Sequence, residues 1–156
     1  MPSYRVHVVG GAVFGASCIY FLNAHTVTSP QTLATWMFCA MLGALFPDID
    51  IKSKGQGIFY LFLIACLAAA LMTRQKMLFI ALAFLSFLPI LSRHRGIFHN
   101  PWVITAVGGT FLLMAPRAFQ NKAMLWNVAF FILGAFSHVI LDIGFRGFWR
   151  RLTGKW

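Results

Sequence analysis

The chain has 156 residues, of which 60% are hydrophobic and 16% aromatic, and its formal net charge is +10. A soluble domain of this length lacks the interior volume to bury so much apolar surface. Its 13 Lys and Arg residues stand in ones and twos between apolar stretches, as in membrane proteins, so we expect an integral membrane protein and no nucleic-acid partner.

Six apolar stretches lie between the charged residues, at 7–22, 32–47, 57–73, 76–92, 101–116 and 124–142. They approach the length of roughly 20 residues, with about 17 as a lower limit, that a membrane-spanning helix needs. Pro89 is expected to bend or end the fourth of them. Because the chain shows no repeat and no linker, we predict an all-α integral membrane protein, with about six short transmembrane helices in one compact bundle over 1–156.

The C-terminal tail and the cysteines have simpler interpretations. The basic and aromatic stretch 143–156 is expected at the level of the lipid headgroups. Residues 23–25 match a signal-peptide cleavage site poorly, so we expect the first span to be retained. Cys18, Cys39 and Cys66 fall inside apolar spans without a CxxC pair and are interpreted as packing residues.

The basic residues predict an orientation. Six spans would place the N-terminus, two of the loops and the C-terminus on one face of the membrane. Nine basic residues then share that face and four lie on the other, so the positive-inside rule places both termini in the cytoplasm and the chain in the inner membrane. The nine are Arg5, Lys52, Lys54, Arg93, Arg95, Arg146, Arg150, Arg151 and Lys155; the four are Arg74, Lys76, Arg117 and Lys122.

Asp48, Asp50 and Asp142 are the only acidic residues, and the chain has no glutamate. The predicted topology brings all three to the cytoplasmic face, and only one histidine, His25, falls on the opposite face. Carboxylates this scarce, placed beside histidines at a membrane, favour metal ligands. The histidines that share their face are His7, His94, His99 and His138.

Two short motifs supply the carboxylates. His138 and Asp142 stand four apart, so a helix places them on one face about 6 Å apart; the alternative is a helix-end histidine bonded to a nearby aspartate. Asp48 and Asp50 follow Pro47, so one can bind metal while the other orients a ligand or acts as a base. The alternative for this pair is a polar helix cap that faces solvent.

The histidines of RHRGIFHN are His94 and His99, and Gly96 and Pro101 argue against one continuous helix through them. Arg93 and Arg95 beside them can bind a phosphate, because guanidinium groups match its oxygens; the alternative is that they only set topology. His7 alone would be an interfacial histidine. The whole set exceeds what one four-coordinate zinc needs, so one or two ions fit.

The segments GALFPDID, RHRGIFHN and GAFSHVILD, after the early His7, resemble the YdjM-type family of membrane-bound, predicted metal-dependent hydrolases. The resemblance covers the chain from His7 to Asp142. It departs from the family's usual HRG-x-TH-S at Phe98 and Asn100, which replace two small hydroxyl residues and affect substrate contacts. The family is similar to zinc-dependent phospholipase C, which implies phosphoester hydrolysis. The matched positions are His7, Asp48, Asp50, His94, Arg95, His99, His138 and Asp142.

The sequence thus predicts a membrane metal-dependent hydrolase with one or two divalent ions, zinc by donor type. Its expected substrate is a phosphoester or lipid phosphate, because the site lies at headgroup depth, and its partners are membrane lipids. A metal-ion or proton transporter and a non-catalytic scaffold with a structural metal site are the alternatives. The expected metal ligands are His7, Asp48, His99, His138 and Asp142; the catalytic residues are Asp50, His94 and Arg95; the phosphate is held by Arg93 and Arg95.

Overall fold

The computed structural model describes residues 3–23, 28–49, 54–91, 97–114 and 122–154. These ranges contain six α-helices and one 3-10 turn and no strand, so the predicted all-α class is confirmed. The elements are α1 (Tyr4–Asn23), α2 (Pro30–Gly43), the 3-10 turn η1 (Phe46–Asp48), α3 (Lys54–Met72), α4 (Lys76–Leu91), α5 (Pro101–Met114) and α6 (Lys122–Leu152).

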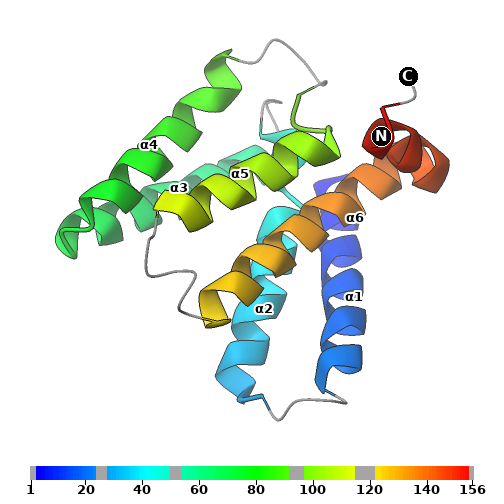
Figure 1. Cartoon of the computed structure of the whole chain (residues 1–156), viewed down its shortest axis with the longest axis horizontal. Coiled ribbons are helices and arrows are strands. Elements are labelled where there is room, and N and C mark those ends of the chain that lie inside the picture. Colours follow the sequence, from blue (N-terminus) through cyan, green and yellow to red (C-terminus); the bar gives the residue numbers. More distant parts are fainter. Residues whose placement is uncertain (1–2, 24–27, 50–53, 92–96, 115–121, 155–156) are drawn as a thin grey trace.

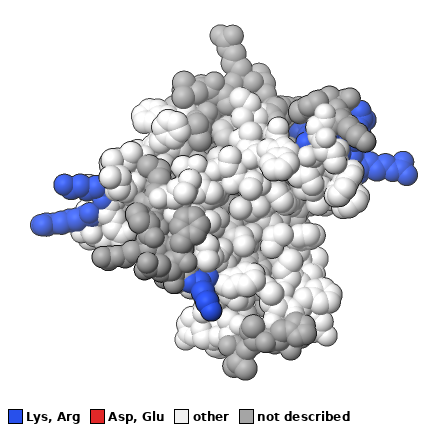
Figure 2. Space-filling model, viewed as in Figure 1, with Lys and Arg blue, Asp and Glu red and all other residues white. Residues whose placement is uncertain are grey.

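The surface is that of a membrane protein. Three helices in the described ranges are long and apolar enough to cross a bilayer: Tyr4–Leu22, Lys54–Met72 and Lys122–Leu152. Large apolar side chains on them stand exposed, among them Leu61 at 71% and Met72 at 84%. Figure 2 shows the Lys and Arg side chains at the periphery of the view, with a broad uncharged surface between them. Only a lipid environment makes such a surface favourable. That the shorter α2, α4 and α5 also cross the membrane stays a prediction.

Local sequence explains where several helices begin. Pro30 is the first residue of α2, and the hydroxyl of Ser29 caps the helix by accepting from the Thr32 amide at 3.3 Å. Pro101 opens α5 in the same way, and the Asn100 side-chain carbonyl accepts from the Trp102 amide at 2.9 Å. Residues 97–99 before α5 form a bend and a turn, while His94 and Gly96 lie outside the described residues.

Helices α1, α2 and α6 form one half of the molecule. The antiparallel pair α1 and α2 is crossed by α6 (Figure 1). Glycines allow the backbones to approach: a Cβ built on Gly134 of α6 would overlap the Ala40 carbonyl oxygen of α2, and one on Gly43 would overlap the Phe131 carbonyl oxygen. Small residues at such crossings are the usual device of membrane helices, because close van der Waals packing replaces the hydrophobic effect there.

Phe46 joins this half to α3 and to the turn before α5. Its ring is fully buried and lies 5.8 Å from that of Phe59, 5.4 Å from Phe98 and 5.5 Å from Phe131. These partners come from α3, from the turn before α5 and from α6. Aromatic contacts of this kind anchor the turn η1 at the centre of the molecule. Asp48 at the end of that turn is thereby held in a fixed place.

Helix α6 is broken near its C-terminal end. Gly144 has φ 72° and ψ 165°, a conformation that a side chain would strain, and it lies two residues after Asp142. The segment beyond it remains helical to Leu152 and packs back on the bundle, where Phe148 meets Phe136 at 5.2 Å. The depth of this segment in the membrane stays a prediction.

Candidate metal centre

Five polar side chains from four parts of the chain meet inside the bundle. His7 lies in the first turn of α1, Asp48 ends η1, His99 lies in the turn before α5, and His138 and Asp142 lie on α6. The side chains of the three histidines are at most 5% exposed, while those of Asp142 and Asp48 are 8% and 19% exposed. Burial this deep requires partners for every charge.

Asp142 is the central carboxylate. Its Oδ2 lies 3.2 Å from His99 Nε2 and 3.4 Å from His138 Nε2, and its Oδ1 lies 3.5 Å from His7 Nε2. The other carboxylate, Asp48, places Oδ1 3.5 Å from His138 Nε2 and 3.8 Å from His99 Nε2. Asp48 therefore faces the histidines and is not a solvent-facing cap.

Four of these residues form a donor set for one cation. Asp48, His99, His138 and Asp142 each offer one ligand atom, and the four atoms lie within 4.8 Å of one another. Zinc–ligand bonds of about 2.0–2.2 Å in a tetrahedron put neighbouring donors roughly 3.3 Å apart. Four of the six separations among these donors, those between a histidine and an aspartate, are 3.2, 3.4, 3.5 and 3.8 Å and come close to that value. A divalent metal ion fits this set.

The hydrogen bond of His138 to the backbone is also typical of a metal ligand. His138 Nδ1 lies 2.7 Å from the Ala44 carbonyl oxygen, which can only accept, so Nδ1 carries the proton and donates it. Nε2 is then the ring atom that faces the two carboxylates, 3.5 Å from Asp48 Oδ1 and 3.4 Å from Asp142 Oδ2. A cation held between these groups would take the Nε2 lone pair and both carboxylate charges. A backbone carbonyl that orients a histidine in this way is the usual outer partner of a metal ligand.

Several buried polar atoms lack a hydrogen-bond partner within the described part of the chain. Two of them, His138 Nε2 and Asp48 Oδ1, face the centre of the donor set. A buried polar atom left without a partner costs about 1–3 kcal/mol. A coordinated cation would satisfy both atoms.

The protonation states outside the spanning helices also suit a metal. Burial and the neighbouring His138 hold the pKa of His99 below its ordinary value, against the opposing effect of the two aspartates. Burial alone would raise the pKa of Asp48, but the adjacent histidines, His138 first, hold it below its ordinary value. Neutral imidazole and ionised carboxylate are the forms that bind metal.

His7 lies beside the four donors. Its ring stacks on that of His138, with centroids 3.7 Å apart and an angle of 19° between the planes. Its Nε2 approaches the Asp142 oxygen that does not face the other histidines. His7 is therefore placed to support Asp142 or to hold a second ion, and its predicted role as a ligand stays a prediction.

A family model described as YdjM inner membrane protein matches residues 1–149 of the chain. The chain belongs to the YdjM inner membrane protein family. This confirms the resemblance carried by the sequence motifs and the inner membrane as the family's location. Comparisons with curated proteins and with solved structures return no match.

Some predicted site residues of this YdjM family member lie outside the described ranges. They are Asp50, Arg93, His94 and Arg95, together with His25 on the opposite predicted face. Their roles stay sequence predictions. Of the two aspartates in GALFPDID, the described donor set contains Asp48. Of the two histidines in RHRGIFHN, it contains His99.

Arg151 is a contributor that the sequence pattern did not reveal. Its Nη1 donates to the backbone carbonyl of His99 at 3.1 Å, and nearby the Trp102 indole donates to the Leu152 carbonyl at 3.0 Å. These bonds tie the turn that bears His99 to the end of α6. In the sequence Arg151 is one more basic residue of the tail, and nothing in its neighbourhood signals a contact 52 residues away.

Replacing Arg151 with glutamine is expected to weaken zinc binding by about tenfold, since a hydrogen bond from a charged group contributes about 1.5 kcal/mol and this one fixes the turn that bears His99. The measurement is a competition titration against a chromophoric zinc chelator in detergent. Arg150→Gln is the matched control, because Arg150 is exposed. Its replacement removes the same charge from the same helix. Equal losses in the two variants would show that overall charge matters and not the bond to His99.

Proposed function

We propose that this YdjM family member is a metal-dependent hydrolase of the inner membrane that cleaves phosphoesters, with lipid phosphates as its substrate class. The observation that carries the proposal is the convergence of Asp48, His99, His138 and Asp142, whose ligand atoms lie within 4.8 Å of one another. The two nitrogen and two oxygen donors suit zinc. The family match and the apolar helices support the membrane setting.

When bound, a zinc-type ion supplies hydroxide at neutral pH by lowering the pKa of a coordinated water to about 7. The protein's own groups do the rest. The Ala44 carbonyl fixes the ring of His138, and Arg151 fixes the loop of His99. Asp142 would hold the ion through Oδ2, which faces His99, while its Oδ1 faces His7.

The remaining roles rest on the sequence. Asp50 is the candidate base, and His94, Arg93 and Arg95 are the candidates for catalysis and for binding the substrate phosphate. The balance of basic residues favours a cytoplasmic position for both termini and for the centre. A metal centre at the cytoplasmic membrane surface would meet the phosphoesters of lipid headgroups.

One observation favours a second candidate, a structural metal site. Four protein donors fill a tetrahedral site, whereas catalytic zinc sites keep one position open. Asp48 is the most exposed of the four and stands at the end of a short turn, so it is the ligand that can yield that position. For hydrolysis, Asp48 would have to leave the ion so that water or substrate can take its place.

The test compares hydrolysis and stability in the same preparations. Zinc-loaded protein in lipid nanodiscs is assayed against a panel of phospholipids and soluble phosphodiesters, and its thermal unfolding is followed with and without a chelator. Turnover that ceases on chelation, with the bundle still folded, supports the hydrolase. Zinc binding with no turnover, and unfolding on chelation, would establish the structural site instead. A protein that stays metal-free after zinc loading would contradict both.

A further inference from the structure

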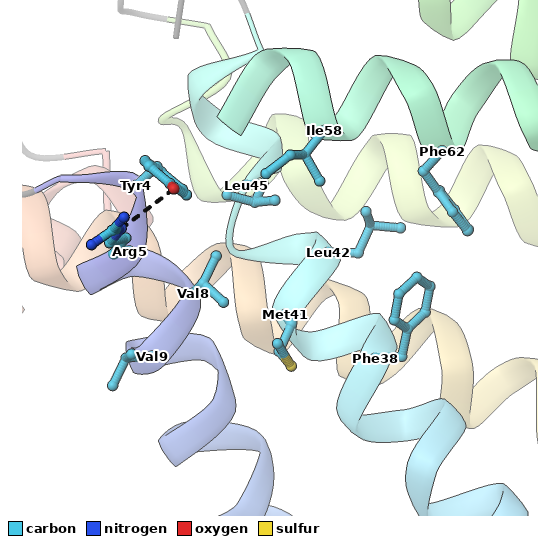
Figure 3. A pocket seen from close by; sticks show the side chains of 10 residues that line it. All are labelled: Tyr4, Arg5, Val8, Val9, Phe38, Met41, Leu42, Leu45, Ile58 and Phe62. Carbon is cyan, nitrogen blue, oxygen red and sulfur yellow. Dashed lines mark hydrogen bonds between the residues drawn. The ribbon is translucent and has the colours of Figure 1, made fainter. Parts of the chain in front are cut away.

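A groove of about 490 Å³ lies along α1, α2 and α3, away from the metal centre's donors. Figure 3 shows Val8 and Val9 of α1 on one side and Ile58 of α3 on the other, with α2 between them. The rings of Phe38 and Phe62 meet at 5.2 Å and close the end farther from Arg5. The volume lies within the range of about 300–1,000 Å³ that small-molecule sites occupy.

The walls of this groove face the bilayer. Val9 is 60% exposed, and Phe38 and Ile58 are exposed to 49% and 47%. Val9 and Ile58 belong to α1 and α3, which are both long and apolar enough to cross the membrane, so these two side chains face lipid. Apart from Tyr4 and Arg5 the lining is apolar. A peptide backbone would find no hydrogen bonds there, whereas a hydrocarbon chain needs none.

The polar end of the groove is positively charged. Arg5 stands in the first turn of a spanning helix, at the depth of the lipid headgroups. Its Nε donates to the Tyr4 hydroxyl at 3.4 Å, and within the described residues it has no carboxylate partner. The two terminal amino groups of Arg5 are of the kind that match phosphate oxygens.

We propose that this groove binds an anionic phospholipid of the surrounding bilayer, with its phosphate on Arg5 and an acyl chain along the apolar walls. The charge at the mouth selects a negative headgroup, and the closed end at Phe38 and Phe62 receives the chain. No lining residue belongs to the metal centre. The proposal therefore goes beyond the proposed function and holds whether or not the lipid is a substrate.

The experiment uses the full chain in phosphatidylcholine nanodiscs that contain a small fraction of phosphatidylglycerol with a photoreactive diazirine on its acyl chain. After irradiation, the labelled residues are mapped by mass spectrometry. Label is expected on Val8, Val9, Met41 and Leu42. Arg5→Gln should reduce labelling by about fivefold, the factor that one basic residue near an anionic membrane surface supplies. The same variant should leave labelling by a phosphatidylcholine analogue unchanged.

Two pairs of variants make the result decisive. Val9→Trp fills the groove and should abolish labelling of its walls, whereas Val13→Trp, at a position 62% exposed on the same helix outside the groove, should not. Arg146→Gln removes an exposed charge elsewhere and should leave labelling intact. A thermal unfolding midpoint equal to that of the parent verifies that each variant is folded.

Three outcomes would overturn the proposal. Label spread equally over lipid-facing residues such as Leu61 and Ile64 would show only contact with bulk lipid. Labelling that does not respond to Arg5→Gln would remove the role of the charged end. Crosslinks between two copies through the groove would show that it is a protein interface.

Discussion

Gly134→Ala is expected to force α6 away from α2 and to destabilise the protein by about 3 kcal/mol, the upper end of what overpacking usually costs. The added methyl group would overlap the carbonyl oxygen of Ala40, a backbone atom that cannot rotate aside as a side chain can. The same crossing holds Ala44 against His138, so zinc binding should fall together with stability. Thermal unfolding in detergent and zinc content of the purified variant measure the two effects.

Gly109→Ala is the matched control. Gly109 lies inside α5, and a Cβ built on it meets nothing within 4 Å. Alanine there should be neutral or stabilise the helix by up to about 1 kcal/mol, because glycine is the poorer helix former. If both variants behave alike, close packing of α2 on α6 does not determine the geometry of the centre.

Asp142→Asn is expected to lower zinc affinity by roughly 100- to 1,000-fold, the cost of removing one charge from a buried ionic cluster. Asparagine keeps the size of the side chain but loses the charge, and the carboxylate it replaces lies within 3.5 Å of three histidines. Competition with a chromophoric chelator measures the affinity. If the protein hydrolyses phosphoesters, turnover should disappear in parallel.

Ser137→Ala tests whether any buried polar change on this helix has the same effect. Ser137 is buried next to His138, but its hydroxyl donates to the Gly134 carbonyl within α6 and does not face the donor set. The zinc affinity of the Ser137→Ala variant should equal that of the parent. An Asp142→Asn protein that retains full zinc affinity would refute the four-donor site.

Much of the fold follows from the sequence because hydropathy acts locally. Each apolar stretch between charged residues has to leave water, whatever its neighbours do, and the backbone of such a stretch must satisfy its own hydrogen bonds as a helix. Counting six spans also assigned the end of each stretch to one face of the membrane. It thereby placed His7, Asp48, His99 and His138 on the same face. The pair His138 and Asp142 needed only helical spacing, and the two lie 3.4 Å apart.

What the sequence determined by itself is therefore the class of protein, its family and the residues that reach one end of the bundle. Only the tertiary structure decided how these residues meet. The bond from His138 to Ala44 spans 94 residues and the bond from Arg151 to His99 spans 52, so no local pattern contains them. The bond from His138 to Ala44 depends on how closely α6 crosses α2, and Gly43 and Gly134 allow that approach by admitting backbone against backbone. Helix formation is a property of each segment, whereas the spacing of metal donors is a property of their packing.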